Sequence, residues 1–160
     1  MIGEVWERYH AVNSQRNDLI RAFLDYRRDL RRVGFKDGFQ WLGGSFVEDT
    51  EMLRGSPPRD MDIVVFLRSA NMIGGPDTYG EDVLRLLSNE YLYETYRLDA
   101  YFVDLDGEGR DTVRHSAYWT QIFGHQRHTS IWKGILQVDQ DTEVADDLVR
   151  SMAYEDVEGA

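Results

Sequence analysis

The chain has 160 residues, with 18 Lys and Arg against 29 Asp and Glu, a formal net charge of −11 and no cysteine. This length fits a single domain over residues 1–160, and 42% apolar residues are enough to fill its core. No apolar run reaches the roughly 18 to 20 residues that span a bilayer, and no signal-peptide pattern opens the chain. The lack of cysteine excludes disulfide scaffolds, Cys-ligated zinc and thiol catalysis. We therefore expect a soluble, cytoplasmic domain without membrane contact.

Charge is distributed unevenly along the chain. Residues 1–59 hold 10 basic and 9 acidic residues, whereas residues 60–160 hold 8 basic and 20 acidic ones. All but two of the basic residues are arginine, which can bind phosphate oxygens in a bidentate way. The strongly negative total argues against binding of bulk duplex DNA, because such binding depends on neutralising phosphates. Any polyanion would have to be bound locally.

The spacing of apolar residues predicts an α+β chain. Apolar residues recur every three or four positions over 5–33, which indicates one or two amphipathic helices in an N-terminal helical segment, 2–33. The other predicted elements, in chain order, are a strand at 39–43, a short helix at 45–53, a loop at 55–58, a strand at 63–67, a flexible loop at 71–78, a helix at 81–91, a strand at 97–105, a helix at 113–123, a strand at 134–138, a helix at 141–152 and a mobile acidic C-terminal tail at 153–160. The expected fold is a small mixed β-sheet with flanking helices.

Two carboxylates stand at the beginning of the most apolar predicted strand. Side chains two residues apart in a strand point to the same face, so Asp60 and Asp62 should project together while Met61 and Ile63 enter the core. Carboxylates held a few ångströms apart repel each other unless a cation lies between them. A hard divalent ion such as Mg²⁺, which prefers oxygen ligands, would satisfy the pair.

A pair of glycines precedes these carboxylates in the sequence. The run Gly43-Gly44-Ser45 lies where a predicted strand passes into a predicted helix, and fourteen residues separate Ser45 from Asp60. Glycine lets the backbone approach a ligand closely, and a helix N-terminus offers unpaired N–H groups to an anion. A phosphate cradle beside a metal-binding acid pair predicts a nucleoside-triphosphate site. No Gly-Lys-Ser/Thr sequence is present, which excludes a P-loop.

A third acid could complete a two-metal site. In the predicted strand 97–105, Asp99 and Tyr101 share one face, and Asp99 can meet Asp60 and Asp62 if this strand pairs beside 63–67. Tyr101 could stack on a base, although packing on the sheet is the commoner role for such a tyrosine.

The combination of Gly44-Ser45, Asp60-Met-Asp62-Ile and a later strand aspartate resembles the polymerase-β-type nucleotidyltransferase superfamily over residues 39–105. The resemblance implies a polymerase-β-like palm fold in which Gly43, Gly44 and Ser45 bind the triphosphate. It further implies that the three aspartates bind two Mg²⁺ or Mn²⁺ ions and that Asp99 accepts the proton of the attacking hydroxyl. The implied activity is transfer of NMP or dNMP from an NTP or dNTP to a hydroxyl acceptor, with release of pyrophosphate.

Basic residues near these motifs are candidates for phosphate contact. Arg54, Arg59, Arg127 and Lys133 are named on this ground, although each taken alone is more often a surface charge. Lys133 carries more weight because lysine is scarce in this chain and the residue adjoins a predicted strand.

The short chain is also similar to minimal nucleotidyltransferases of toxin–antitoxin and anti-phage defence operons, including the Hailong type. This resemblance implies one hypothesis in which Tyr154, in the expected tail, is the acceptor on which a short single-stranded oligonucleotide is built. A second hypothesis is an antitoxin that adenylylates a toxin or effector protein from the same operon. A third is a degenerate domain that binds a nucleotide or a partner without catalysis.

Other motifs compete with this interpretation. The run Asp104-Leu-Asp106 could begin a calcium loop, but the twelfth position is His115 rather than Glu, so a turn is favoured. The run Asp139-Gln-Asp141 is more typical of a helix cap. The spacing of His125 and His128 would suit a zinc site, but no third ligand is evident and Gly124 interrupts the helix.

Overall fold

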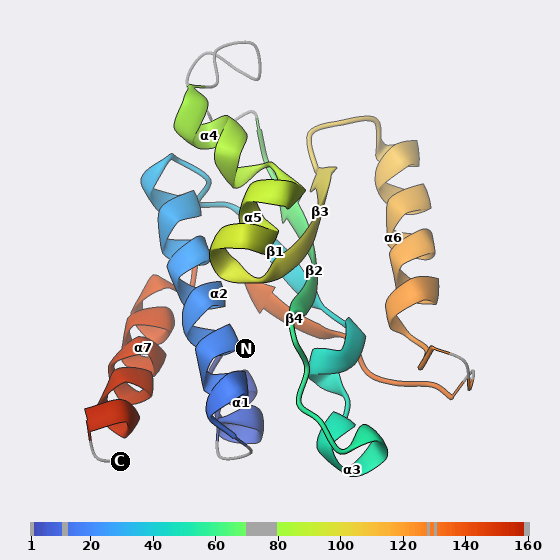
Figure 1. Cartoon of the computed structure of the whole chain (residues 1–160). Helices are drawn as coiled ribbons and strands as arrows, with labels where there is room; N and C mark the ends of the chain where they lie inside the picture. The colour runs from blue at the N-terminus through green and yellow to red at the C-terminus, as the bar shows by residue number, and fades with distance from the viewer. Residues whose placement is uncertain (1, 11–12, 70–79, 128, 130, 159–160) are drawn as a thin grey trace.

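The computed structural model describes residues 2–10, 13–69, 80–127, 129 and 131–158. The chain forms an α+β fold with a four-stranded mixed sheet between layers of helices (Figure 1). The helices are α1 (Ile2–Tyr9), α2 (Ser14–Arg32), the 3₁₀ helix η1 (Gly44–Val47), α3 (Thr50–Arg54), α4 (Glu81–Leu86), α5 (Asn89–Tyr96), α6 (Gly109–Phe123) and α7 (Glu143–Glu158). The strands are β1 (Gly38–Leu42), β2 (Met61–Leu67), β3 (Leu98–Asp104) and β4 (Leu136–Asp139). Within the described residues, no helix is both long and apolar enough to cross a bilayer. The expected loop at 71–78 lies outside the described residues.

The order of strands in the sheet is β3-β2-β1-β4. β1 pairs antiparallel with both β2 and β4, whereas β2 and β3 run parallel. A parallel pair needs a crossover connection, which here contains α4 and α5. The mixed sheet expected from the sequence is therefore confirmed.

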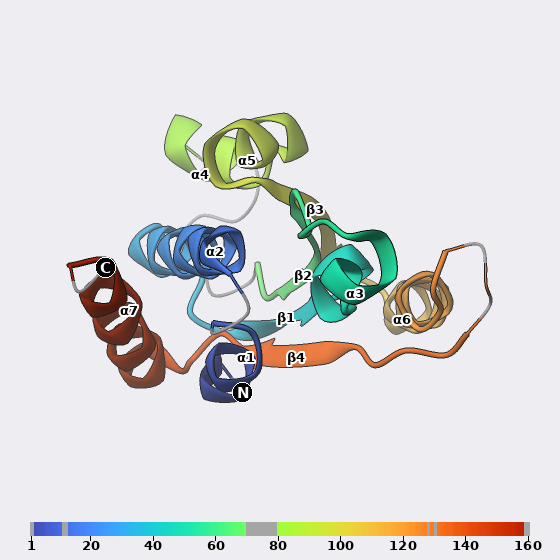
Figure 2. The ribbon, with the colours of Figure 1, turned by 60° about the horizontal axis from the view of Figure 1, so that its bottom comes forward.

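One face of the sheet carries the main apolar core. β2 alternates so that Met61, Ile63 and Val65 point to this face, where they are fully buried. Helices α1, α2, α4, α5 and α7 all contribute apolar side chains to the same core. Figure 2 shows α2 and α7 on one side of the sheet and α6 on the other.

The opposite face packs against α6. Val64 and Phe66 of β2 form a smaller apolar cluster with Trp119 and Phe123 of α6. Because side chains alternate along a strand, every second residue of β2, counted from Val64 and Phe66, points to the α6 face. Asp62 is one of them. The register partners of these residues in β3 point to the same face.

Several helix boundaries differ from the sequence prediction. The helix expected at 45–53 is one 3₁₀ turn, η1, followed by the five-residue α3. The helix expected at 81–91 is two helices, because Ser88 begins α5 as its N-cap and accepts a hydrogen bond from the Tyr91 N–H. α6 begins at Gly109, four residues before the predicted start at 113.

The C-terminal helix extends further than the sequence predicted. α7 continues through Glu158, so residues 153–158 are helical, and residues 159–160 lie outside the described part. Ala153 is fully buried in the main core. The ring of Tyr154 lies under the Arg21 guanidinium, 5.7 Å from its Cζ, so this tyrosine has a packing partner on α2.

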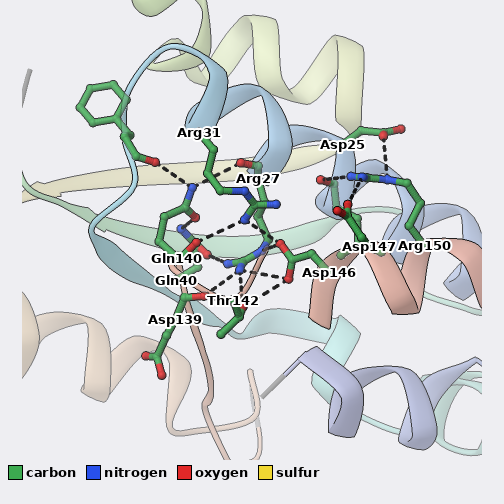
Figure 3. A network of polar contacts seen from close by, with 12 residues as sticks. Asp25, Arg27, Arg31, Gln40, Asp139, Gln140, Thr142, Asp146, Asp147 and Arg150 are labelled. Carbon is green, nitrogen blue, oxygen red and sulfur yellow. Dashed lines mark hydrogen bonds and ion pairs between the residues drawn. The ribbon is translucent and has the colours of Figure 1, made fainter. Parts of the chain in front are cut away.

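Part of the arginine-rich N-terminal half is committed to a buried network (Figure 3). Arg27 of α2 is fully buried and pairs with the fully buried Asp146 of α7 at 2.8 Å, and Arg31 pairs with the same carboxylate at 2.7 Å. The side chains of Gln40 and Gln140 extend the network into β1 and the end of β4. These arginines hold α2, α7 and the sheet together and are not exposed to an external polyanion.

Candidate functional site

Three carboxylates come together at the start of the parallel strand pair. Asp62 and Asp99 are direct partners in the β2–β3 register, and Asp60 immediately precedes β2. All three are half-buried and line a cavity of about 820 Å³ on the α6 side of the sheet. The expected adjacency of Asp99 to the other two is therefore confirmed, while their catalytic role remains a prediction.

The glycine turn after β1 closes tightly on Asp62. The Gly43 N–H donates a hydrogen bond to the Asp62 backbone carbonyl at 3.0 Å. Gly44 has a φ of +60°, and a Cβ built on it would lie 1.6 Å from Asp62 Oδ2. A Cβ at Gly43 would lie 2.3 Å from the Phe123 ring. Both positions therefore require glycine, one because the carboxylate occupies the space and the other because α6 does.

The segment after the glycines has a different form from the one expected. Ser45 lies in η1, a 3₁₀ helix of four residues, and not at the start of a longer α-helix. Such a turn lacks the aligned peptide dipoles of a long helix. The expectation of a longer helix starting here is wrong, and anion binding by the turn stays a prediction. Gly44 and Ser45 nevertheless line the cavity beside the carboxylates.

The carboxylates repel one another. Burial raises the pKa of Asp62, and the charges of Asp60 and Asp99 raise it further. Burial also raises the pKa of Asp60, and the charge of Asp99 adds to this. Arg127 lines the cavity and its charge partly offsets both effects. The cavity thus holds an excess of negative charge that a bound cation would relieve.

Lys133 has a structural partner within the site. Its Nζ donates to the Gly44 carbonyl at 2.7 Å and pairs with Glu48 Oε1 at 2.6 Å. The Glu48 side chain is 3% exposed and also pairs with Arg54 at 3.3 Å. Lys133 and Arg54 both line the cavity, but the Lys133 ammonium braces the glycine turn instead of standing free for a phosphate. Sequence reasoning did not identify Glu48, because a single glutamate carries no motif.

A buried arginine fixes the segment that carries this turn. Arg16 of α2 donates to the carbonyls of Phe46 and Glu48 at 2.6 and 2.7 Å and pairs with Glu51 at 2.8 Å. The hydrogen bond from Arg16 lowers the pKa of Glu51 to about 2. Arg16 therefore connects α2 to η1 and α3 and limits movement of the segment that follows the glycine turn.

Two side chains contact the carboxylate of Asp99. Asn89, the first residue of α5, donates from Nδ2 to Asp99 Oδ1 at 3.0 Å. The Tyr101 hydroxyl lies 3.5 Å from Asp99 Oδ2, and its ring packs on Trp119 with centroids 4.4 Å apart. Tyr101 therefore packs against α6, the commoner of the two roles considered for it. Asn89 was missed because the sequence placed it inside one helix over 81–91, although the pair Ser88-Asn89 is typical of a helix start.

Two other predicted residues, Arg59 and Tyr154, are not gathered at the site. Arg59 is exposed beside Asp60 and is not among the residues that line the cavity. Tyr154 lies on α7, on the far side of the sheet from the carboxylates (Figure 2). His125 lines the cavity and stacks on Trp132 with ring centroids 4.0 Å apart, whereas His128 lies outside the described residues.

No metal site is already formed in the described part of the chain. No three or more His, Asp or Glu side chains there are arranged so that they could hold a metal ion. The three aspartates supply oxygen donors of the kind that Mg²⁺ and Mn²⁺ prefer. Burial and the neighbouring negative charges raise the pKa values of Asp60 and Asp62, an effect that added positive charge would offset. The donor set fits such an ion, provided that the side chains adjust on binding.

Comparisons with known proteins give one family. Searches of curated proteins and of solved structures found no match to this chain. A model described as "Family of unknown function (DUF6932)" matches residues 2–139, which include α1 to α6, all three aspartates and the glycine turn. The match covers most of the chain, and the protein therefore belongs to the DUF6932 family.

Proposed function

We propose that this protein is a metal-dependent nucleotidyltransferase with a polymerase-β-like palm fold. The observation that carries the proposal is the side-by-side register of Asp62 and Asp99, with Asp60 and the glycine turn in the same cavity. The proposed reaction transfers NMP or dNMP from a nucleoside triphosphate to a hydroxyl acceptor and releases pyrophosphate. The site alone supports this function, because the family is one of unknown function and a fold does not determine an activity.

In this proposal Asp60, Asp62 and Asp99 would hold two Mg²⁺ or Mn²⁺ ions. Bound there, divalent cations would neutralise the phosphates and acidify the acceptor hydroxyl. Asp99 would accept the proton from that hydroxyl through Oδ2, which accepts a long hydrogen bond of 3.5 Å from Tyr101, whereas its Oδ1 accepts from Asn89 at 3.0 Å. The carboxylates would thus bring the acceptor and the metal-bound phosphates within reach of each other.

The phosphate tail would lie along the glycine turn. Gly44 and Ser45 line the cavity beside Asp62, and Arg127 lines it with a cationic group. Lys133 would contribute by positioning the glycine turn, because its ammonium donates a hydrogen bond to the Gly44 carbonyl. Arg59 would have to rotate in order to contribute.

The acceptor is the open part of the proposal. A partner toxin or effector protein and a short single-stranded oligonucleotide both provide hydroxyls, and either would suit a toxin–antitoxin or anti-phage setting. Self-priming on Tyr154 would require α7 to move, or a second copy to supply the tyrosine, because α7 packs on α1 and α2 away from the cavity.

A second candidate is a domain that binds a nucleotide or a partner protein without catalysis. It is favoured by the lack of an already formed metal group among the described residues. Only the catalytic candidate would release pyrophosphate, so this product distinguishes the two.

The test is incubation with each α-labelled NTP and dNTP in the presence of Mg²⁺ or Mn²⁺, followed by pyrophosphate detection and a denaturing gel. We expect metal-dependent pyrophosphate release that Asp62→Asn abolishes. Removing the charge should leave the metal-free fold at least as stable, because the ionised form is the one that burial disfavours. Asp104→Asn is the matched control, since Asp104 is an exposed carboxylate at the other end of β3.

The gel also identifies the acceptor. Label on this protein that disappears in Tyr154→Phe would indicate self-priming, and a ladder would indicate an oligonucleotide. Nucleotide binding without pyrophosphate release, or full activity of Asp62→Asn, would overturn the catalytic proposal.

A further inference from the structure

One part of the cavity wall carries no acidic side chain. It is formed by the C-terminal end of α6 and the residues that follow, namely Gln121, Ile122, Phe123, His125 and Gln126. In the proposed site the aspartates hold the metal ions and the glycine turn holds the phosphates, so this part of the wall is left for the rest of the nucleotide. A nucleobase has flat apolar faces and polar edges, and a wall of rings, an aliphatic group and amides matches that chemistry.

His125 is the ring of this wall whose orientation is fixed from two directions. Its Nδ1 donates a hydrogen bond to the Gln121 carbonyl at 3.1 Å, because a carbonyl oxygen can only accept. The indole of Trp132 packs on the imidazole, with ring centroids 4.0 Å apart. Phe123, the other ring of the wall, is buried against Trp119 in the smaller apolar cluster. His125 is therefore the ring that is both held in place and half-buried at the cavity.

Trp132 is held beside His125 by the backbone. The two residues form an antiparallel bridge, and backbone hydrogen bonds of 2.8 Å lie on either side of it. The next residue, Lys133, lines the cavity and donates to the Gly44 carbonyl, which ties this segment to the glycine turn. The Trp132 side chain is 75% exposed, so burial in the core does not account for its position.

We propose that His125 binds the base of the substrate nucleotide by stacking, and that Trp132 is a positioning residue that holds the imidazole in place. The inference rests on the proposed function for the identity of the ligand. Stacking on an aromatic face tolerates any base, because every base has a π-face. The amides of Gln121 and Gln126 line the same wall and supply donors and acceptors for the edge of the base.

The test compares a ligand that has a base with one that lacks it. Calorimetric titration in Mg²⁺ with the α,β-methylene analogues of the NTPs and dNTPs measures binding without turnover, and inorganic triphosphate is the probe without sugar or base. His125→Ala should weaken analogue binding on the order of 10-fold and leave triphosphate binding unchanged. Trp132→Ala should have the same selective effect but a smaller one, because His125 keeps its hydrogen bond to the Gln121 carbonyl.

Two variants separate stacking from general damage. His125→Phe keeps a flat aromatic ring and should restore most of the affinity that His125→Ala loses. His115→Ala is the matched control, since His115 is an exposed histidine of α6 that is not among the residues lining the cavity. It should bind the analogues as wild type does.

Proton NMR reads the stacking contact directly. The Hε1 resonance of His125, assigned by its absence in His125→Phe, should move upfield when an analogue binds, because the base lies over the ring. Inorganic triphosphate should not produce this shift.

Pyrophosphate release decides the proposed function separately. Analogue binding that depends on His125, without pyrophosphate release, would refute the transferase and leave the base site standing. Analogue binding no tighter than that of triphosphate, or equal effects of His125→Ala on the two ligands, would overturn the inference even in an active transferase. It would also be overturned if His125→Ala weakened binding of a single-stranded oligonucleotide but not of the analogues, because the ring would then serve the acceptor.

Discussion

Gly44→Ala is the most direct test of the packing between the glycine turn and the carboxylates. The new Cβ would lie 1.6 Å from Asp62 Oδ2, far inside van der Waals contact, so the Asp62 side chain must rotate away or the turn must shift. The residue would also keep a φ of +60°, which costs a side chain with a Cβ roughly 1 to 2 kcal/mol. These two costs can be separated by a control elsewhere in the chain.

Gly55→Ala is that control. Gly55 ends α3 with a φ of +69°, and a Cβ there would meet no atom within 4 Å. Gly55→Ala should lower the unfolding free energy only by the backbone cost, about 1 to 2 kcal/mol. Gly44→Ala should lose more, about 2 to 4 kcal/mol, because it adds a steric conflict at a packed site.

The assay combines urea unfolding, followed by tryptophan fluorescence, with calorimetric titration of Mn²⁺. Gly55→Ala should bind Mn²⁺ as wild type does, whereas Gly44→Ala should bind it more weakly because Asp62 is displaced. Equal losses of stability in the two variants, together with equal Mn²⁺ affinity, would refute the reasoning.

Two other contacts around the turn give measurable predictions. The pKa of Glu51 is about 2 in the folded protein and 4.5 without its partners, so its pairing with Arg16 stabilises the fold above about pH 4.5 and loses that contribution as the pH falls toward 2. For a side chain one-quarter exposed we expect a contribution of about 2 kcal/mol, and urea unfolding from pH 3 to 7 should show a flatter pH dependence in Glu51→Gln than in wild type. Lys133→Met leaves the buried Glu48 without its closer cation and should cost about 3 kcal/mol, of which Lys133→Met combined with Glu48→Gln should recover a part. If the stability loss of the double variant in thermal or urea unfolding equals the sum of the two single losses, the two side chains do not act as a pair.

Much of the site follows from local sequence. Period-two alternation predicts Asp62 on the face opposite Met61 and Ile63, and the structure has this arrangement, with Met61 and Ile63 buried in the core and Asp60 immediately before β2. The glycine pair after a short strand predicted a close backbone approach to a ligand. In the structure Gly44 approaches Asp62 closely, and ligand binding stays a prediction. Such features depend on backbone geometry over a few residues, which a sequence pattern reports directly.

The partners of charged residues depended on the tertiary structure. Arginine-rich segments are typical of phosphate-binding surfaces. In this chain, however, Arg16, Arg27 and Arg31 are each buried against an acid or a carbonyl. Lys133 was expected to reach a phosphate and instead braces the turn through Glu48 and the Gly44 carbonyl. A charge pattern cannot reveal these pairings because the acidic partners are 35 to 119 residues apart in the chain.

The sequence by itself determined which side chains could form a metal and phosphate site, since residue type and strand parity are local properties. The tertiary structure decided whether they meet. The parallel pairing of β3 with β2, in the register that places Asp99 opposite Asp62, comes from a crossover through α4 and α5 that packs on the main core. The same crossover delivers Asn89 to Asp99, and the packing of α7 on α1 and α2 keeps Tyr154 away. These outcomes depend on how whole elements bury their apolar faces together, which no short motif encodes.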